Sequence, residues 1–528
     1  MTRKKWLAAL IIAAVIAAKA ATVFRFGFPV TISKETTYIT EPIRPDGFPD
    51  YMAALNRRSS EGVTPQNNAM VLICSAFGPS IIDEKQREAH FQLLGMPAPP
   101  EQGDYFISSA AHEKTVIARR MNLPHGNDGL PADDIRVQLW EQYDSAAARP
   151  WSKAEFPEWA EWLDLNEKPL ELLIEASQRP RCYEPLVGDS VILALLDGSQ
   201  SSRDAARALV IRATLNLNEG KIDEAWRDLA SCHRLARLAG QGPTLINMLI
   251  AVTIDQMACK GDLALLAHDK LDSTQLARMR DDWSKLPPMP VVAEILDWGE
   301  RLTCLDSVLF MSRENFDGMD GGEKEPKGAF ARLKNSLKKA SLDWDLMLRM
   351  QNEQCDRMVA ACRKPTRAER LRAFEIIAEE NKRNIEESRK WQNLARAVLL
   401  NTRKRAISGM IGRIMMSLLA PSASAGMAAG DRAAMCFETT NLAFALAAYR
   451  LDNGGVYPEK LDALVPKYVK ELPKDIFNND ADLNYSRKNG GYLLYSVGPN
   501  GIDDGGKGIE DRGKDKDCDD IGVQMTGK

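Results

Sequence analysis

The stretch that decides the fold runs from Leu442 to Pro458 and reads L-A-F-A-L-A-A-Y-R-L-D-N-G-G-V-Y-P. Together with the residues before it, its apolar spacing predicts an amphipathic helix over 431–452 that buries one face. Asn453 and Gly454 follow, and both residue types tolerate the left-handed backbone that ends many helices. The chain therefore turns sharply at this point.

Downstream of this turn the sequence changes its period. A short helix is predicted near 459–464, and strand-like segments follow at 483–487 and 492–497. The linker between these strands contains Asn489-Gly490, which is a strong hairpin signal between β-prone runs. The order predicts a long helix packed on a small antiparallel sheet, which is an α+β module. Upstream, segment 407–429 contains Arg413 and Pro421 and is too interrupted to be predicted as a membrane span.

The C-terminal order of residues resembles the soluble part of the major pseudopilin of type II secretion. The resemblance covers roughly 407–523, under a quarter of the chain, and its last two motifs are Tyr495-Ser496-Val497-Gly498-Pro499-Asn500-Gly501 and Asp519-Asp520-Ile521-Gly522. The earlier matching residues are Tyr449, Asp452, Gly454, Tyr457, Pro458, Leu464, Val465, Pro466, Tyr468, Leu472, Pro473, Asp475 and Asn478. The resemblance implies the fold of that domain and a link to a secretion apparatus.

The chain departs from the pseudopilin pattern at the start of the module. Asn401-Thr402-Arg403-Lys404-Arg405 stands where the family has an unbroken membrane helix, and no leader-processing motif precedes it. We therefore do not expect the module to enter a pilus through the usual bundle of membrane helices.

An acidic, glycine-rich loop follows the predicted hairpin. Calcium prefers six to eight oxygen ligands from carboxylates and carbonyls, and glycines let a backbone wrap around an ion. We predict calcium ligands at Asn500, Asp503, Asp504, Asp511, Asp519 and Asp520. Pseudopilins of this type bind calcium in this loop, and the match to the family points most directly to Asn500, Asp519 and Asp520. The alternative is a solvated tail that Lys507, Arg512, Lys514 and Lys516 neutralise without a metal.

The rest of the chain is predicted to be mainly helical. With 528 residues, 45% hydrophobic content and a net charge of −4, it has room for several domains and lacks the basic footprint of a nucleic-acid-binding protein. Apolar spacing predicts a helical hairpin at 203–218 and 222–239. We predict an anchor or signal at 1–24, an extended stalk at 25–49, a helical domain at 50–286, a second helical region at 287–405 with a mobile loop at 318–328, and the pseudopilin-like domain at 406–528.

The N-terminus is typical of an export signal. Arg3, Lys4 and Lys5 precede the apolar run Trp6–Phe24, in which Lys19 is the one charged residue. The run approaches the ~20 residues that span a bilayer, so we expect a single-pass membrane anchor at 6–24 with the bulk of the chain on the extracytoplasmic side. Cleavage near Ala18-Lys19-Ala20, which would release a periplasmic protein, is the alternative. Local segments from Asp50 and from Pro157 also resemble large uncharacterised envelope proteins of planctomycete-type bacteria.

No motif in the sequence indicates a reaction. The five histidines lie far apart, without zinc-site spacing, and phosphate-loop and nucleophile-elbow motifs are missing from the sequence. The nine cysteines contain no C-x-x-C, and we expect most of them to be small buried side chains. Trp151, Trp159 and Trp162 are expected in the core, although they could stack on a sugar.

We therefore expect a non-enzymatic envelope protein with a structural or protein-interaction role and other envelope proteins as partners. The two alternatives are a component or adaptor of a type II secretion-like apparatus, and an envelope hydrolase or carbohydrate-binding protein.

Overall fold

The computed structural model describes residues 30–122, 131–188, 190–194, 201–268, 271–313, 342–389, 403–511 and 517–526. The predicted anchor at 1–24 and the predicted loop at 318–328 lie outside these ranges. In the described part the protein is mainly helical with small antiparallel sheets near its C-terminus, which confirms the predicted fold class.

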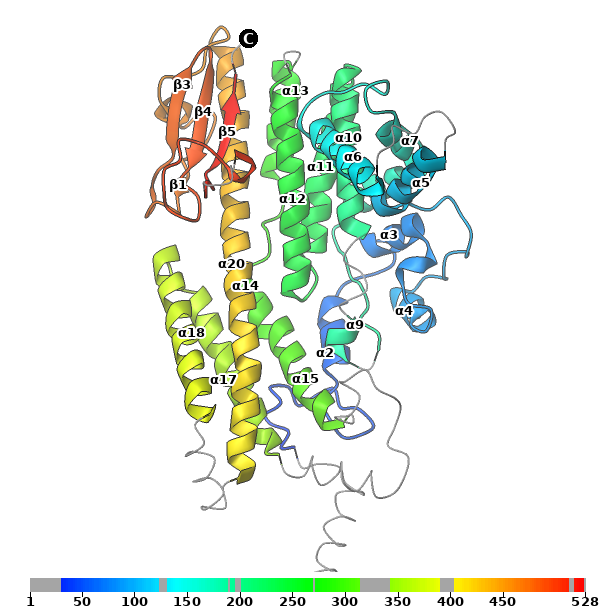
Figure 1. The fold of residues 1–528 in the computed structure, drawn as a ribbon, viewed down its shortest axis with the longest axis vertical. Helices are drawn as coiled ribbons and strands as arrows, with labels where there is room; N and C mark the ends of the chain where they lie inside the picture. Colours follow the sequence, from blue (N-terminus) through cyan, green and yellow to red (C-terminus); the bar gives the residue numbers. More distant parts are fainter. Residues whose placement is uncertain are drawn as a thin grey trace, which may run out of the picture.

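One long helix organises the molecule. Helix α20 spans Arg403–Asp452 and runs along most of the length of the fold in Figure 1, so it begins well before the predicted start at 431. Pro421 lies inside this helix, where a proline destabilises the helix by about 3 kcal/mol because it removes a main-chain hydrogen bond. Helices α17 (Trp344–Cys362) and α18 (Arg367–Arg389) pack against the N-terminal half of α20, which contains Pro421. Burial of Ala420 and Ala423 against these neighbours helps to offset that cost.

Four antiparallel helices form the upper bundle beside the C-terminal half of α20 (Figure 1): α10 (Ser201–Asn218), α11 (Ile222–Ala239), α12 (Leu245–Leu266) and α13 (Ser273–Ser284). The first two are the predicted hairpin, joined through Gly220 at φ +75°. Helix α12 begins with a capping box, in which the side chains of Thr244 and Asn247 satisfy each other's main-chain N–H groups.

The N-terminal helices lie on the side of the molecule away from the sheet, where most of them cover the upper bundle, whereas α2 and α9 pack lower down, on the helix at 301–313 (Figure 1). They are α2 (Tyr51–Ser59), α3 (Ala69–Phe77), η1 (Pro79–Ile81), α4 (Arg87–Leu94), α5 (Ser109–Asn122), α6 (Ala132–Ala148), α7 (Pro157–Leu165), α8 (Glu167–Ser177) and α9 (Val191–Ala194). Before them, residues 30–49 contain only turns and one isolated bridge, but they pack onto the lower helices. Asn352 on α17, for example, donates a hydrogen bond of 2.8 Å to the carbonyl of Thr36.

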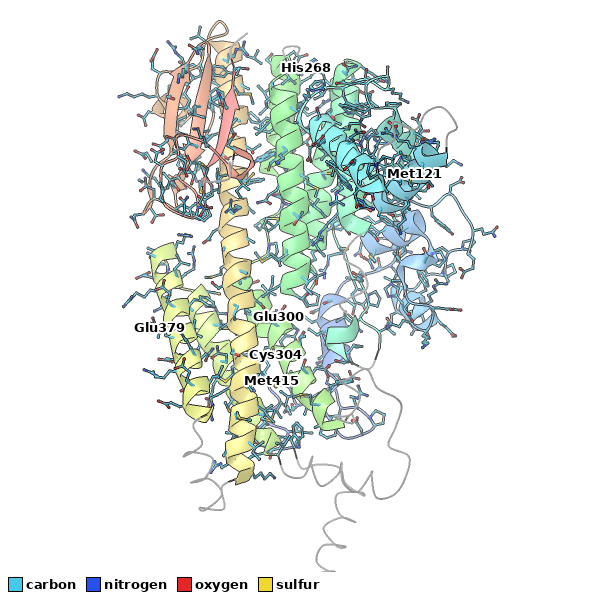
Figure 2. All side chains as sticks on the ribbon, in the orientation of Figure 1. Met121, His268, Glu300, Cys304, Glu379 and Met415 are labelled. Atoms are coloured by element: carbon cyan, nitrogen blue, oxygen red, sulfur yellow. The ribbon has the colours of Figure 1, made fainter. Side chains whose placement is uncertain are left out.

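The lower half of the molecule is built around the N-terminal half of α20. It contains α14 (Val292–Ile295), the π-helical turn η2 (Leu296–Glu300) and α15 (Arg301–Arg313), together with α17 and α18. Gly299 in the π-turn lies so close to Pro243 that an added Cβ would stand 1.6 Å from the Pro243 carbonyl oxygen. The next residue, Glu300, lies below the first turn of α12 in Figure 2 and accepts a 2.8 Å hydrogen bond from the main-chain N–H of Leu245.

The sheet packs on the upper end of α20. Strands β3 (Asn484–Lys488), β4 (Gly491–Ser496) and β5 (Ile521–Met525) are antiparallel in the order β3-β4-β5, with Tyr485 opposite Leu494 and Leu494 opposite Val523. Asn489 and Gly490 both have positive φ in the β3–β4 turn, which confirms the predicted hairpin. The predicted short helix is the 3₁₀ turn η4 (Leu461–Leu464), and the remaining elements are β1 (Lys474–Asp475), β2 (Ala481–Asp482) and η5 (Ile509–Asp511).

The sheet and the upper bundle share one hydrophobic core. Leu442 and Phe444 of α20 belong to the same buried cluster as Trp226 of α11 and Leu494 and Val523 of the sheet. The C-terminal module is therefore held against the helices on a continuous apolar surface.

Candidate functional site

The predicted calcium ligands lie in the loop between β4 and β5. Glycine is required where that loop begins, because Gly498 has φ +71° and an added Cβ would stand 2.1 Å from the Asp519 carbonyl oxygen. This close approach brings Asn500 beside the far end of the loop. The main-chain N–H of Asn500 donates to the Asp519 carboxylate at 3.2 Å, and its side-chain amide donates to the Asp517 carbonyl at 2.9 Å.

Asp520, which is buried, lies against the half-buried Asp504. One oxygen of Asp520 accepts hydrogen bonds from the main-chain N–H groups of Gly506 at 2.8 Å and Asp504 at 3.1 Å. The second oxygen of Asp520 and Oδ2 of Asp504 are buried and have no hydrogen-bond partner in the described part of the chain. Burial, followed by the charges of Asp504 and Asp503, raises the pKa of Asp520.

The other predicted ligands are turned to local partners. Asp503 accepts a 2.9 Å hydrogen bond from the Tyr495 hydroxyl, and Asp511 accepts one of 3.0 Å from the main-chain N–H of Gly508. Arg432 of α20 approaches Asp519 to 3.9 Å. Within the described residues, no three acidic side chains of this loop bring their oxygens to within 4.8 Å of one another.

The structure reveals a second polar site, buried between α11 and α12. His233 is fully buried, with Nδ1 2.6 Å from Asp255 and Nε2 2.8 Å from Asp262. Arg237, one turn further along α11, forms an ion pair with Asp255 and donates to the Pro287 carbonyl at 3.2 Å. We call these four residues the upper cluster. The ring of Trp283 on α13 closes it, with its centroid 4.8 Å from that of His233.

Opposite charges set the protonation of the upper cluster. Burial alone would lower the pKa of His233, but the charges of Asp262 and Asp255 and their hydrogen bonds raise it to about 9. Burial would raise the pKa of Asp255, but His233 and Arg237 outweigh it and lower that pKa. For Asp262 the effect of burial prevails, and its pKa is raised. At neutral pH both ring nitrogens of His233 are therefore protonated, one facing Asp255 and the other facing Asp262.

Two thiols border the upper cluster. Cys259 lies on α12 three residues before Asp262, and its sulfur, His233 and Asp262 offer three ligand atoms within 4.8 Å of one another. A hydrogen bond with the side chain of Cys436 on α20, followed by burial, raises the pKa of Cys259. Helices α12 and α20 thus each contribute a thiol, and the two thiols lie next to each other.

Sequence reasoning missed this site because its residues are up to 203 positions apart, the separation of His233 and Cys436. One local signal was present. Asp255 and Asp262 are the two acidic residues in the otherwise largely apolar helix Leu245–Leu266, and their spacing of seven places them on one helical face. A pair of buried carboxylates requires a cationic partner, which the sequence pattern could not identify.

A mainly apolar cavity of about 110 Å³ lies between the N-terminal helices and the upper bundle. His90, Cys182, Glu184 and Gln241 are among its lining residues. Burial lowers the pKa of His90 to about 4 and so favours its uncharged form.

The three tryptophans of the N-terminal region are core residues, as expected. Trp151, Trp159 and Trp162 are at most 2% exposed. Their indole N–H groups donate to main-chain carbonyls of Ile211, Leu139 and Ile107 at 2.7–2.9 Å. Their ring faces are therefore covered by protein.

In the described part of the chain, one helix is long and apolar enough by composition to cross a membrane, over Lys404–Asp452. This is α20, whose neighbours α12, α17 and α18 pack along it. Comparison of the chain with models of known families, with curated proteins and with solved structures found no match.

Proposed function

We propose that this chain is a single-pass envelope protein with a structural role, anchored through residues 6–24, whose C-terminal helix–sheet module binds other envelope proteins. The observation that carries the proposal is the continuity of α20, which is at once the helix of the module and the central helix of the lower half. A module joined in this way cannot swing freely, because a bend would break the shared core.

Contacts beside α20 support a rigidly held module. Arg367 of α18 lies 4.5 Å from the ring centroid of Phe477, and Arg370 forms a 3.0 Å ion pair with Asp431. Arg280 of α13 donates a hydrogen bond to the carbonyl of Tyr468. A rigid module loses little conformational entropy when it binds a partner, which favours a binding role.

The surface of the module offers apolar contacts for a partner. Ile502 is 61% exposed and Val456 is 51% exposed, and Ile509 is also exposed. Ile502 and Ile509 lie in the same loop as the predicted calcium ligands. We propose that calcium, where it binds, orders this loop as part of the contact surface.

The second candidate function is an adaptor of a type II secretion-like apparatus. The helix–sheet order of the module favours it, because this is the order that the resemblance to the major pseudopilin implies. The N-terminal half of α20 is covered by α17 and α18, so such an adaptor would dock through the surface of its module rather than insert a free helix into a bundle. The buried tryptophans give no support to the carbohydrate-binding alternative.

Crosslinking in intact envelopes tests the binding role. The full-length protein, with a tag, is crosslinked and purified beside the double variant Ile502→Ser/Ile509→Ser and the control Val137→Ser, which removes an exposed apolar residue from α6. We expect specific partners to be lost from the double variant and kept by the control. Identical partners in all three samples would contradict a binding role for this loop.

Fractionation tests the proposed address. We expect the protein in the membrane fraction, with its bulk cut by protease added from the extracytoplasmic side. Replacing three apolar residues of 6–24 by aspartate should abolish export, because each charge costs about 2.5–3.5 kcal/mol at the centre of a membrane helix. Recovery of the unchanged protein with cytosolic markers would overturn the address.

A further inference from the structure

The upper cluster and its neighbouring thiols contain the donor set of a metal site. A ring nitrogen of His233, the sulfur of Cys259 and a carboxylate oxygen of Asp262 lie within 4.8 Å of one another. Imidazole, thiolate and carboxylate are the three donor types that Zn²⁺ takes in proteins. We propose that His233, Cys259 and Asp262, with Cys436 as the fourth ligand, bind a zinc-class divalent cation that links α11, α12 and α20.

An unpartnered polar atom points independently to a missing cation. Asp262 is fully buried, and its Oδ1 has no hydrogen-bond partner in the described part of the chain. Leaving a buried acceptor unsatisfied costs about 1–3 kcal/mol, and more when the group is charged. A cation bound by Asp262 would remove this cost, whereas the histidine alone satisfies only Oδ2.

The surroundings of His233 match those of a metal-binding histidine. In such sites one ring nitrogen binds the ion while the other donates to a carboxylate that fixes the orientation of the ring. Here Nδ1 faces Asp255 at 2.6 Å, and Nε2 faces the side of Asp262. Arg237 in turn holds Asp255 through an ion pair, so Asp255 and Arg237 are positioning residues.

Cys436 completes a four-ligand set. Its side chain forms a hydrogen bond with that of Cys259, so the sulfur of α20 lies next to one of the three donors. Structural zinc sites are almost always tetrahedral, with four protein ligands. A site closed in this way, inside the core, would stabilise the fold rather than activate a water molecule.

The rearrangement on binding is small. Nε2 of His233 and Oδ2 of Asp262 are 2.8 Å apart, with a proton between them. Around a tetrahedral zinc ion, nitrogen and oxygen ligands stand roughly 3.3 Å apart, from bond lengths near 2.0–2.1 Å. The two side chains would separate by about 0.5 Å, which side-chain rotation on two neighbouring helices can supply.

Metal binding changes the charge of the site by one unit. Without metal, the positive charges of His233 and Arg237 balance those of Asp255 and Asp262. Binding of M²⁺ displaces one proton from the imidazolium and one from each of the Cys259 and Cys436 thiols, because cysteine binds a metal as the thiolate, and the three protons go to solvent. Two positive charges enter and three protons leave, so the loaded cluster carries one negative charge. No oxidant or reductant is required.

The experiment measures metal content and the ligand field together. The full-length protein is unfolded, stripped with a chelator and refolded with Zn²⁺ or Co²⁺, because three of the four proposed ligands are buried and a metal reaches them most readily during folding. We expect one zinc per chain after dialysis, and a cobalt form with thiolate-to-metal charge-transfer absorption and the intense visible bands of tetrahedral cobalt.

Two variants and one control assign the ligands. Cys259→Ala and Asp262→Asn should each retain less than a tenth of the metal. We expect Cys259→Ala to lose the thiolate-to-metal charge-transfer band and Asp262→Asn to lose the tetrahedral cobalt bands. Cys232→Ala is the matched control: this cysteine is also fully buried, on α11 next to His233, but its thiol donates to the Ala206 carbonyl instead. It should bind metal as the natural sequence does.

Three results would overturn the proposal. They are a refolded natural protein without bound metal, a Cys259→Ala variant that keeps its metal, and recovery of a Cys259–Cys436 disulfide by non-reducing peptide mapping of protein from envelopes. The cobalt spectrum of the natural sequence needs no variant, so a variant that fails to fold does not remove the test. None of these results depends on the proposed envelope partners.

Discussion

The two halves of the molecule bury an ionic cluster in different ways. In the upper half, His233, Arg237, Asp255 and Asp262 enclose one another, each with a side chain at most 5% exposed. In the lower half, Arg301 is equally buried, but its partners Asp297 and Asp356 have side chains that are 35% and 68% exposed. The upper cluster is cut off from water, and the lower one opens to it.

This difference determines what each cluster can do. In the lower cluster, the Arg301 guanidinium donates hydrogen bonds to Asp297 at 2.9 Å, to Asp356 at 2.6 Å and to Asn352. It also lies over the ring of Tyr38. Water can supply what its exposed carboxylates lack. The upper cluster has to satisfy every atom internally, and it leaves one oxygen of Asp262 without a partner. An enclosed site with an unmet acceptor favours a bound ion, whereas a solvated pair does not.

Removing one carboxylate from each cluster should give the largest contrast. In metal-free protein, Asp255→Asn leaves the charges of His233 and Arg237 short of a partner and should cost about 3–5 kcal/mol of unfolding free energy. Asp356→Asn should cost under about 1 kcal/mol, because its side chain is largely solvated. Urea unfolding of both variants measures the difference. Equal losses would show that enclosure does not separate the two clusters.

The contrast between the halves also shows how far the sequence could be interpreted. Local signals were sufficient for the β3–β4 hairpin, since a two-residue hairpin turn requires positive φ and Asn489 and Gly490 both tolerate it. They were also sufficient for the α10–α11 hairpin. The start of α20 was predicted wrongly, because Pro421 disfavours a helix locally and only packing by α17 and α18 outweighs it. Tertiary contacts of this kind leave no local pattern.

Candidate sites divide in the same way. The acidic loop was visible because its residues are near one another in the chain, although the structure gathers only part of them. The upper cluster depends on His233 meeting α12 and α20 in space, and no spacing rule connects those segments. Sequence therefore reveals sites built from one loop and misses sites built from several helices.

Acid should single out a buried histidine that has no counter-charge. Burial lowers the pKa of His90 to about 4, against 6.5 in an unfolded chain. Below pH 6.5, His90 binds a proton in the unfolded state but stays neutral in the folded state. The free energy of unfolding therefore falls as the pH drops from 6.5 toward 4. The loss is up to about 3 kcal/mol. His233, which has two carboxylate partners, should not contribute to this loss.

The variant His90→Gln isolates the effect. We expect its unfolding free energy to fall less steeply than that of the natural sequence between pH 7 and pH 4, so that the two curves converge in acid. Carboxylates common to both proteins cancel in the difference. Parallel curves would mean that His90 takes up its proton in the folded state.

Two glycines of the acidic loop separate strain from crowding. Gly505→Ala should cost about 1 kcal/mol, because its φ of +72° is strained for alanine but no atom lies within 4 Å of the added Cβ. Gly498→Ala should cost about 2–3 kcal/mol, because the new carbon also meets the Asp519 carbonyl. Thermal unfolding ranks the two. A smaller effect at Gly498 would mean that the loop ends are not closely joined, and that this loop is more open than described.

Calcium should give the smallest effect, and it tests whether an open acidic site can hold an ion as an enclosed one can. At 1 mM calcium, the affinities typical of extracellular modules predict about 0.4–1.4 kcal/mol of added stability. Asp520→Ala and Asp519→Ala should abolish the gain, whereas Asp133→Ala, on the exposed surface of α6, should keep it. Melting of the full-length protein with and without calcium measures the shift. Because a specifically bound ion must stabilise the native form, an unchanged melting temperature would leave the loop neutralised by its own basic residues, and Arg432 would be the partner that Asp519 retains.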